Sequence, residues 1–199
     1  MLDDKTVGYY AVATTVCNMW VFVLASIIDS MYPSILKLYK EDYRAYERKN
    51  KQLYAIVFYL SLIVSLGFIL FGEFIIKILY GVEYMSAVTP LKIVTFYTAF
   101  SYLGVARNAW IVCENQQKYL KYMYFGAAVT NIGLNLIFIP ILGTSGAALA
   151  SLVTQICTSI ILPMFFKGTR RNSQLMIDAI LLKGIFNERI DTNGENNKI

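Results

Sequence analysis

Residues 122–166 form an uninterrupted stretch without a charged side chain. Such a stretch is too long for one pass through a membrane, because a spanning helix needs about 20 apolar residues. Charged residues make up 16% of the chain, whereas soluble domains carry about 25%. This composition excludes a soluble globular domain, a disordered chain and a disulfide scaffold, and it predicts an all-α, polytopic membrane helix bundle.

Apolar segments of spanning length occur five times along the sequence. The expected transmembrane helices cover about residues 7–33, 53–79, 91–113, 119–139 and 146–166. Pro140, Gly143 and Gly146 interrupt the long uncharged stretch, so we expect two antiparallel helices there. Residues 1–168 then form the transmembrane part. Residues 169–199 form a cytoplasmic tail with an interfacial helix at about 173–186.

Lysine and arginine are concentrated in alternate connections between the expected spans. These connections hold Lys37, Lys40, Arg44, Arg48, Lys49, Lys51, Lys118, Lys121, Lys167, Arg170 and Arg171. The connection around residues 81–90 carries only Glu83, and the PILGTSG turn carries no charge. By the positive-inside rule, the C-terminus is cytoplasmic and the N-terminus is outside. The same pattern argues against a nucleic-acid partner.

The residue types that usually carry enzyme chemistry are missing or scattered. The chain has no histidine, which is the commonest general base and metal ligand near neutral pH. Cys17, Cys113 and Cys157 occur singly in apolar segments, where a small buried hydrophobe is the expected role. No paired-carboxylate motif or glycine-rich phosphate loop is present. We therefore expect no catalytic residues, no metal and no cofactor, and a protein that is not an enzyme.

Arg107 is the most informative polar residue within the expected spans. It lies about six residues from the cytoplasmic end of its segment, in GVARNAWIVC. One interpretation is a side chain that extends to the membrane surface. The other is a cation in a water-filled cavity, where its planar fork would hold an anionic substrate such as a phosphate, with the Asn108 amide beside it.

Asn131 and Asn135 are four residues apart, so they share one face of the fourth span. Hydrogen bonds between helices account for such a pair without a substrate, and this is the favoured interpretation. A substrate contact is the alternative. Small residues in the fourth and fifth spans permit close helix approach or sliding, as a transporter bundle requires.

Three sequence blocks resemble one known family. NIGLNLIFIPILGTSGAALAS (131–151) resembles the signature of Wzx-type polysaccharide flippases in the multidrug/oligosaccharidyl-lipid/polysaccharide exporter superfamily. The matching positions are Asn131, Leu134, Asn135, Ile139, Pro140, Gly143, Gly146, Ala147 and Ala148. VGYYAVA (7–13) and LYGVEYMSAVTPL (79–91) resemble two further motifs of that family. Leu142 departs from the family, which often has an aromatic residue before the turn glycine.

The resemblance implies a flippase of two pseudo-symmetric six-helix lobes, with this chain matching spans eight to twelve. Such proteins carry undecaprenyl-pyrophosphate-linked oligosaccharides across the bacterial cytoplasmic (inner) membrane by alternating access. The expected partners are the lipid-linked oligosaccharide, membrane lipids and a missing N-terminal lobe of the same protein. A multidrug/cation antiporter or a lipid II flippase of the same superfamily remains open. A membrane enzyme of envelope polysaccharide assembly is a further alternative.

Overall fold

The computed structural model describes residues 4–184, and the regular elements in this range are all helical, as expected of an all-α bundle. In chain order they are α1 (Asp4–Asn18), α2 (Val21–Glu41), α3 (Tyr43–Tyr80), the 3-10 helix η1 (Val82–Ala87), α4 (Val88–Cys113), the 3-10 helix η2 (Gln117–Tyr119), α5 (Leu120–Leu142), α6 (Thr144–Ile156), the π-helix η3 (Cys157–Ile161), α7 (Leu162–Phe165) and α8 (Arg170–Ile180).

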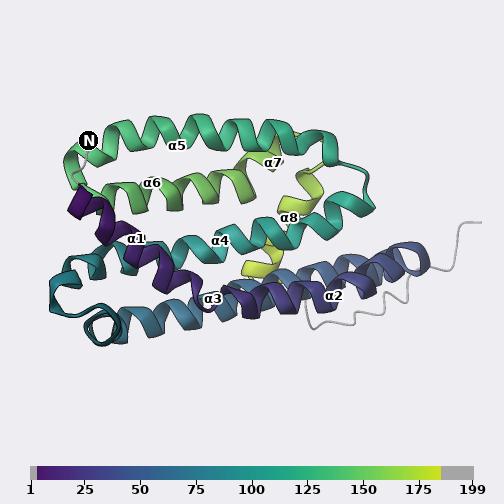
Figure 1. The fold of residues 1–199 in the computed structure, drawn as a ribbon. Coiled ribbons are helices and arrows are strands. Elements are labelled where there is room, and N and C mark those ends of the chain that lie inside the picture. Colours follow the sequence, from purple (N-terminus) through teal and green to yellow (C-terminus); the bar gives the residue numbers. More distant parts are fainter. Residues whose placement is uncertain (1–3, 185–199) are drawn as a thin grey trace, which may run out of the picture.

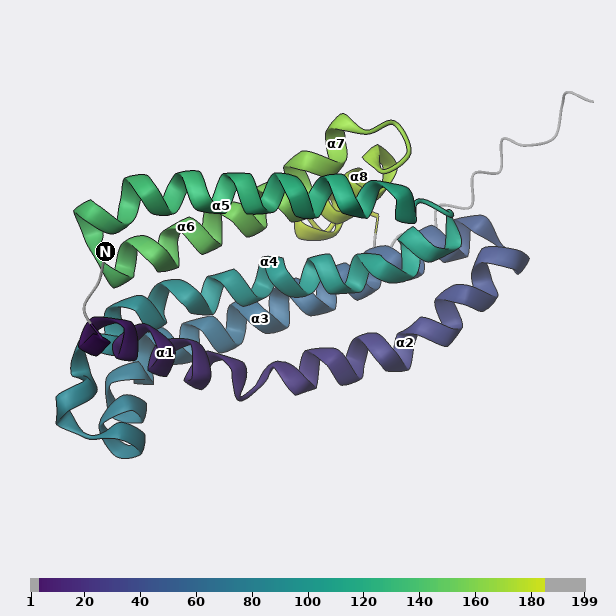
Figure 2. The same ribbon diagram turned by 45° about the horizontal axis from the view of Figure 1, so that its top comes forward.

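The long helices run along one common direction, and their connections gather at two opposite ends (Figures 1 and 2). The α2–α3, α4–α5 and α7–α8 connections lie together at one end, which we call the basic end. The start of α1, the α3–α4 connection and the α5–α6 turn lie at the other. The alternation of basic and non-basic connections along the sequence therefore becomes a separation of charge in space.

Four helical segments are long and apolar enough to cross a membrane. They are Val21–Glu41, Tyr43–Tyr80, Gln117–Leu142 and Thr144–Phe165. Helix α4, which includes Lys92 and Arg107, is not among them, although it runs through the middle of the bundle (Figure 1). The membrane bundle is thus confirmed, while the count of five spans stays a prediction.

The expected first span, residues 7–33, is not one continuous helix. The chain turns at residues 19–20, where α1 ends after Asn18 and α2 begins at Val21. The amide of Met19 bonds to the carbonyl of Val16 at 3.2 Å, a tight i to i−3 bond of the kind that closes helix ends. Pro33 lies inside α2, which continues to Glu41, so this proline does not end the segment.

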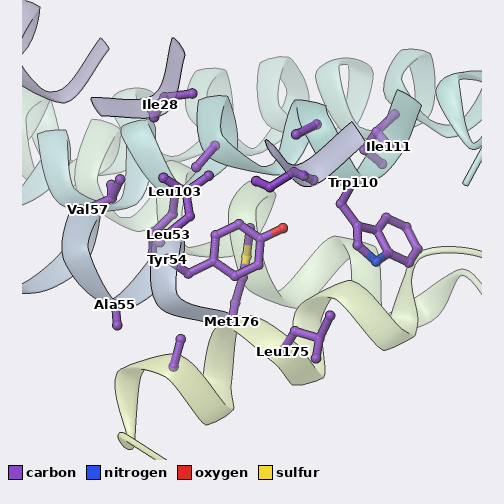
Figure 3. Close-up of a cluster of buried hydrophobic side chains, with 14 of the residues drawn as sticks. Ile28, Leu53, Tyr54, Ala55, Val57, Leu103, Trp110, Ile111, Leu175 and Met176 are labelled. Carbon is purple, nitrogen blue, oxygen red and sulfur yellow. The ribbon is translucent and has the colours of Figure 1, made fainter. Parts of the chain in front are cut away.

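Two hydrophobic cores hold the bundle together. At the basic end, α2, α3, α4 and α8 bury a cluster that includes Tyr54, Trp110 and Met176 (Figure 3). Towards the opposite end, α1, α3, η1, α4 and α6 enclose a second cluster around Cys17 and Leu91. Helix α4 contributes to both clusters and therefore connects the two cores.

Helix α8 packs into the bundle and is shorter than the expected 173–186 segment. Its buried face carries Asn172, Ser173, Leu175, Met176 and Ala179. Polar contacts anchor it along α3: Asn172 donates to the Tyr54 hydroxyl at 2.6 Å, and the Tyr59 hydroxyl donates to the carbonyl of Ile180 at 2.7 Å.

Arg171 and Glu47 add a forked ion pair to this contact, with Nε and Nη2 each 2.6 Å from a carboxylate oxygen. The bond from Glu47 raises the pKa of the Arg171 guanidinium. Residues 181–184 follow α8 as a turn, and the rest of the expected interfacial segment lies outside the described residues.

The turn between α5 and α6 is set by glycine. Helix α5 continues through Pro140 to Leu142, so among the three residues expected to interrupt this stretch it is Gly143 that ends the helix. Gly143 has φ 58° and ψ −130°, a conformation that costs a residue with a Cβ considerable strain. At Gly146 a Cβ would clash with the Phe138 carbonyl, which shows how closely α6 begins against α5.

Candidate functional site

Arg107 is buried inside the bundle, with 3% of its surface exposed. Its Nη1 donates to the carbonyl of Thr158 at 3.1 Å, which connects α4 to η3. The side chain therefore does not extend to the membrane surface, and this finding removes the first of the two interpretations given above.

The positive charge of Arg107 has no carboxylate partner within residues 4–184. Its Nε is buried without a hydrogen-bond partner in the same range. An unpaired buried donor costs about 1–3 kcal/mol, and more when the group is charged. A guanidinium also stays protonated in proteins. The site therefore holds a cation with unused hydrogen-bonding capacity, which favours an anion or water beside it.

A cavity of about 150 Å³ lies where α4, α5, α6 and η3 meet. It is lined by Ser101, Gly104, Val105, Arg107, Asn108, Tyr124, Gln155, Thr158 and Ser159. Since a water molecule takes about 30 Å³ of liquid volume, this space corresponds to about five waters. The structure thus brings two of the predicted site residues, Arg107 and Asn108, into one polar cavity.

Several lining residues were not singled out from the sequence as site residues. Helix α4 presents Ser101, Gly104, Val105 and Asn108, which follow the i, i+3, i+4, i+7 spacing of one helical face. Across the cavity, Gln155, Thr158 and Ser159 repeat the i, i+3, i+4 spacing. The signal that would have located the cavity is the polar residues on these two faces, Ser101 and Asn108 on one and Gln155, Thr158 and Ser159 on the other.

Asn131 and Asn135 do not line this cavity. Asn131 Nδ2 donates to Thr154 Oγ1 of α6 at 3.4 Å, and Asn135 Nδ2 donates to the Asn131 carbonyl and Oδ1, each at 2.9 Å. Thr158 Oγ1 in turn donates to the Thr154 carbonyl at 2.7 Å. The asparagine pair therefore makes the expected bond between helices, one helical turn away from the Arg107 contact.

Comparison with known proteins gives one match. Residues 1–89 match the family model described as "Polysaccharide biosynthesis protein". The matched part covers α1, α2, α3 and η1 together with the VGYYAVA motif. No curated protein and no solved structure matches the chain.

The match agrees with the resemblance that the sequence motifs indicate. Two of the three motif blocks lie in or overlap residues 1–89, whereas the 131–151 block and Arg107 lie beyond the matched part. The structure also contains helices that are long and apolar enough to cross a membrane. Together these findings describe a chain with helices of membrane length whose residues 1–89 match a polysaccharide biosynthesis family.

Proposed function

We propose that this chain forms part of a transporter, not an enzyme, that moves undecaprenyl-pyrophosphate-linked oligosaccharide across the bacterial cytoplasmic membrane. The observation that carries the proposal is Arg107, a buried cation at the edge of a polar cavity that finds no acidic partner among residues 4–184. A pyrophosphate would supply the negative charge that pairs with the Arg107 guanidinium. The family match supplies the link to polysaccharide.

In this mechanism Arg107 holds a phosphoryl oxygen while the rest of the substrate stays outside the small cavity. Nη1 is already engaged by the Thr158 carbonyl and Nε is buried, so the second terminal nitrogen is the group that meets the substrate. The Asn108 amide is exposed and lines the same cavity, where it can donate a second bond. Asn131 and Asn135 would contact the sugar only after their bonds within the helix pair open.

Alternating access requires a second lobe that closes the pathway from the other side. Helix α5 exposes most of its apolar side chains, and Met123 is its one buried residue. That surface is suited to lipid or to a partner lobe. The basic end would face the cytoplasm, where anionic lipid and the positive-inside rule place lysine and arginine, and the C-terminal tail would lie on that side.

A multidrug/cation antiporter of the same superfamily is less compatible with these side chains. Binding a cation or a proton inside a membrane bundle calls for a buried carboxylate. Among residues 4–184 no Asp or Glu is buried, and the charged side chain that is buried with an unused donor is Arg107. The charge of the cavity therefore favours an anionic substrate such as a lipid-linked pyrophosphate.

Arg107→Ala and Arg107→Lys in the complete protein test the proposal. Surface polysaccharide is measured in cells that lack the native gene, with protein level in the membrane as a second readout. We expect Arg107→Ala to lower export about tenfold or more, because the charge-assisted bond to the phosphoryl group is lost. Arg107→Lys should restore part of the export.

Arg44→Lys, at an exposed position of the basic end, is the control and should leave export unchanged. Unchanged export in both Arg107 variants, at normal protein level, overturns the proposal.

A further inference from the structure

The segment Thr144–Phe165 changes from an α-helical to a π-helical hydrogen-bond pattern directly beside Arg107. Residues Cys157–Ile161 form a π-helix, in which the amide of Leu162 donates to the carbonyl of Cys157, five residues back. In an α-helix the same amide would donate to Thr158. The register change therefore takes away the donor that the Thr158 carbonyl would otherwise have.

Pro163 removes the other possible donor to this carbonyl. In the π register the amide of residue 163 would donate to Thr158, but proline has no N–H. The Thr158 carbonyl is left free of both backbone donors within a buried part of the bundle. Arg107 Nη1 takes that place at 3.1 Å.

Neighbouring contacts keep α4 and the π-helix at this separation. Ser159 Oγ donates to the Phe100 carbonyl at 2.7 Å, and a Cβ at Gly104 would lie 3.3 Å from Ser159 Oγ. Thr169 Oγ1 donates to the carbonyl of Pro163 at 2.8 Å, which fixes the proline as well. These contacts, from α4 and from the α7–α8 connection, hold the Thr158 carbonyl opposite Arg107.

We propose that Pro163 is a positioning residue that acts through Arg107. By keeping the Thr158 carbonyl free, it fixes one end of the guanidinium through Nη1 and leaves the second terminal nitrogen for an anion in the cavity. A lysine would have to make both contacts from a single nitrogen, without the rigid planar fork that separates them in arginine. The expected effect on transport rests on the proposed function. The effect of Pro163 on Arg107 is tested independently of that function.

The decisive comparison is Pro163→Ala against the same position carrying the ester analogue of alanine, lactic acid, which lacks the N–H. Alanine returns a backbone donor to Thr158, directly or by restoring the α register. The ester has the alanine side chain without the donor. The complete protein, labelled with 15N-arginine and placed in lipid nanodiscs, is examined by NMR for a slowly exchanging guanidinium signal that is missing in Arg107→Lys.

We expect this signal in the native protein and in the ester variant, and its loss or fast exchange in Pro163→Ala. Export should fall about tenfold in Pro163→Ala, recover in the ester variant, and show no further loss when Pro163→Ala is added to Arg107→Lys, because both act on one group.

Two outcomes overturn the positioning role: an unchanged guanidinium signal in Pro163→Ala, or equal loss of the signal in the alanine and ester variants, which would assign the effect to the proline ring. A different outcome concerns the proposed function. If the signal follows the N–H as expected but export stays normal in Pro163→Ala and Arg107→Lys, the link between Pro163 and Arg107 is supported and the transport role of Arg107 is overturned.

Discussion

At Gly146 the chain has room for a hydrogen and nothing larger. An added Cβ would meet the Phe138 carbonyl, which belongs to the backbone of α5 and cannot rotate away. Gly133, on α5 itself, has no neighbouring atom within 4 Å of an added Cβ. The two glycines therefore serve different purposes, although the sequence places both in the same motif-rich block.

Gly146→Ala should destabilise the protein by about 1–3 kcal/mol, because the α5–α6 backbones must move apart to accept the methyl group. The matched control is Gly133→Ala, which should be neutral or stabilising by up to about 1 kcal/mol through helix propensity. The measurement is the thermal unfolding midpoint of the purified protein in detergent. Equal midpoints for the two variants would contradict the close approach described above.

At the scale of the element, the amphipathic helix α8 gains a defined position by packing against α3. Its apolar residues alone would suit a membrane surface. In the bundle, the buried Asn172–Tyr54 bond and the Arg171–Glu47 pair give α8 one defined position along α3. The ion pair is partly exposed and contributes little, since such pairs are generally worth about 0–1 kcal/mol. The buried amide bond should dominate.

Asn172→Ala should therefore loosen α8, at a cost of about 1–3 kcal/mol, because the buried Tyr54 oxygen loses its donor and the hydroxyl keeps only its 3.5 Å bond to Asn50 Oδ1. A cysteine placed at Met176, which is fully buried, reports the change through maleimide labelling in a background without the native cysteines. Labelling should be slow in the native sequence and at least several-fold faster in Asn172→Ala.

Two controls accompany this measurement. Gln174→Ala lies on the exposed face of α8 and should leave labelling at residue 176 slow. A cysteine at Leu181, which is exposed, should react equally in every variant. Slow labelling at residue 176 in Asn172→Ala would show that α8 does not depend on this bond.

At the scale of the whole molecule, the two ends of the bundle differ in charge. The basic connections gather at one end, and the α3–α4 connection with the α5–α6 turn lies at the other (Figures 1 and 2). Transfer of a polytopic chain into a bacterial membrane retains lysine- and arginine-rich loops in the cytoplasm. This arrangement predicts which end of the bundle a membrane-impermeant reagent reaches from outside intact cells.

Single cysteines at Lys40 and Lys118 should be protected from a membrane-impermeant maleimide in intact cells, and a cysteine at Glu83 should be labelled. All three positions are exposed in the structure, so access depends on the side of the membrane. Permeabilised cells provide the control, since all three should then react. Labelling of residue 40 or 118 from outside intact cells would reverse the proposed orientation.

The sequence by itself determined the class of the fold, because 45 uncharged residues in succession cannot be kept in water and must form helices in lipid. It also determined the order of the connections and the turn at Gly143, since these depend on local charge and local backbone freedom. Arg107 and Asn108 were identified as site candidates for the same reason: a charge in an apolar segment is visible without a fold.

Tertiary structure alone decided what those residues contact. Whether Arg107 reaches the surface or a cavity depends on the helix packed against it, and the free Thr158 carbonyl exists only because of a register change 51 residues further along the chain. The position of α8 likewise depends on neighbours distant in sequence. Periodicity specifies which faces of a helix are apolar, but packing selects the partner of each face.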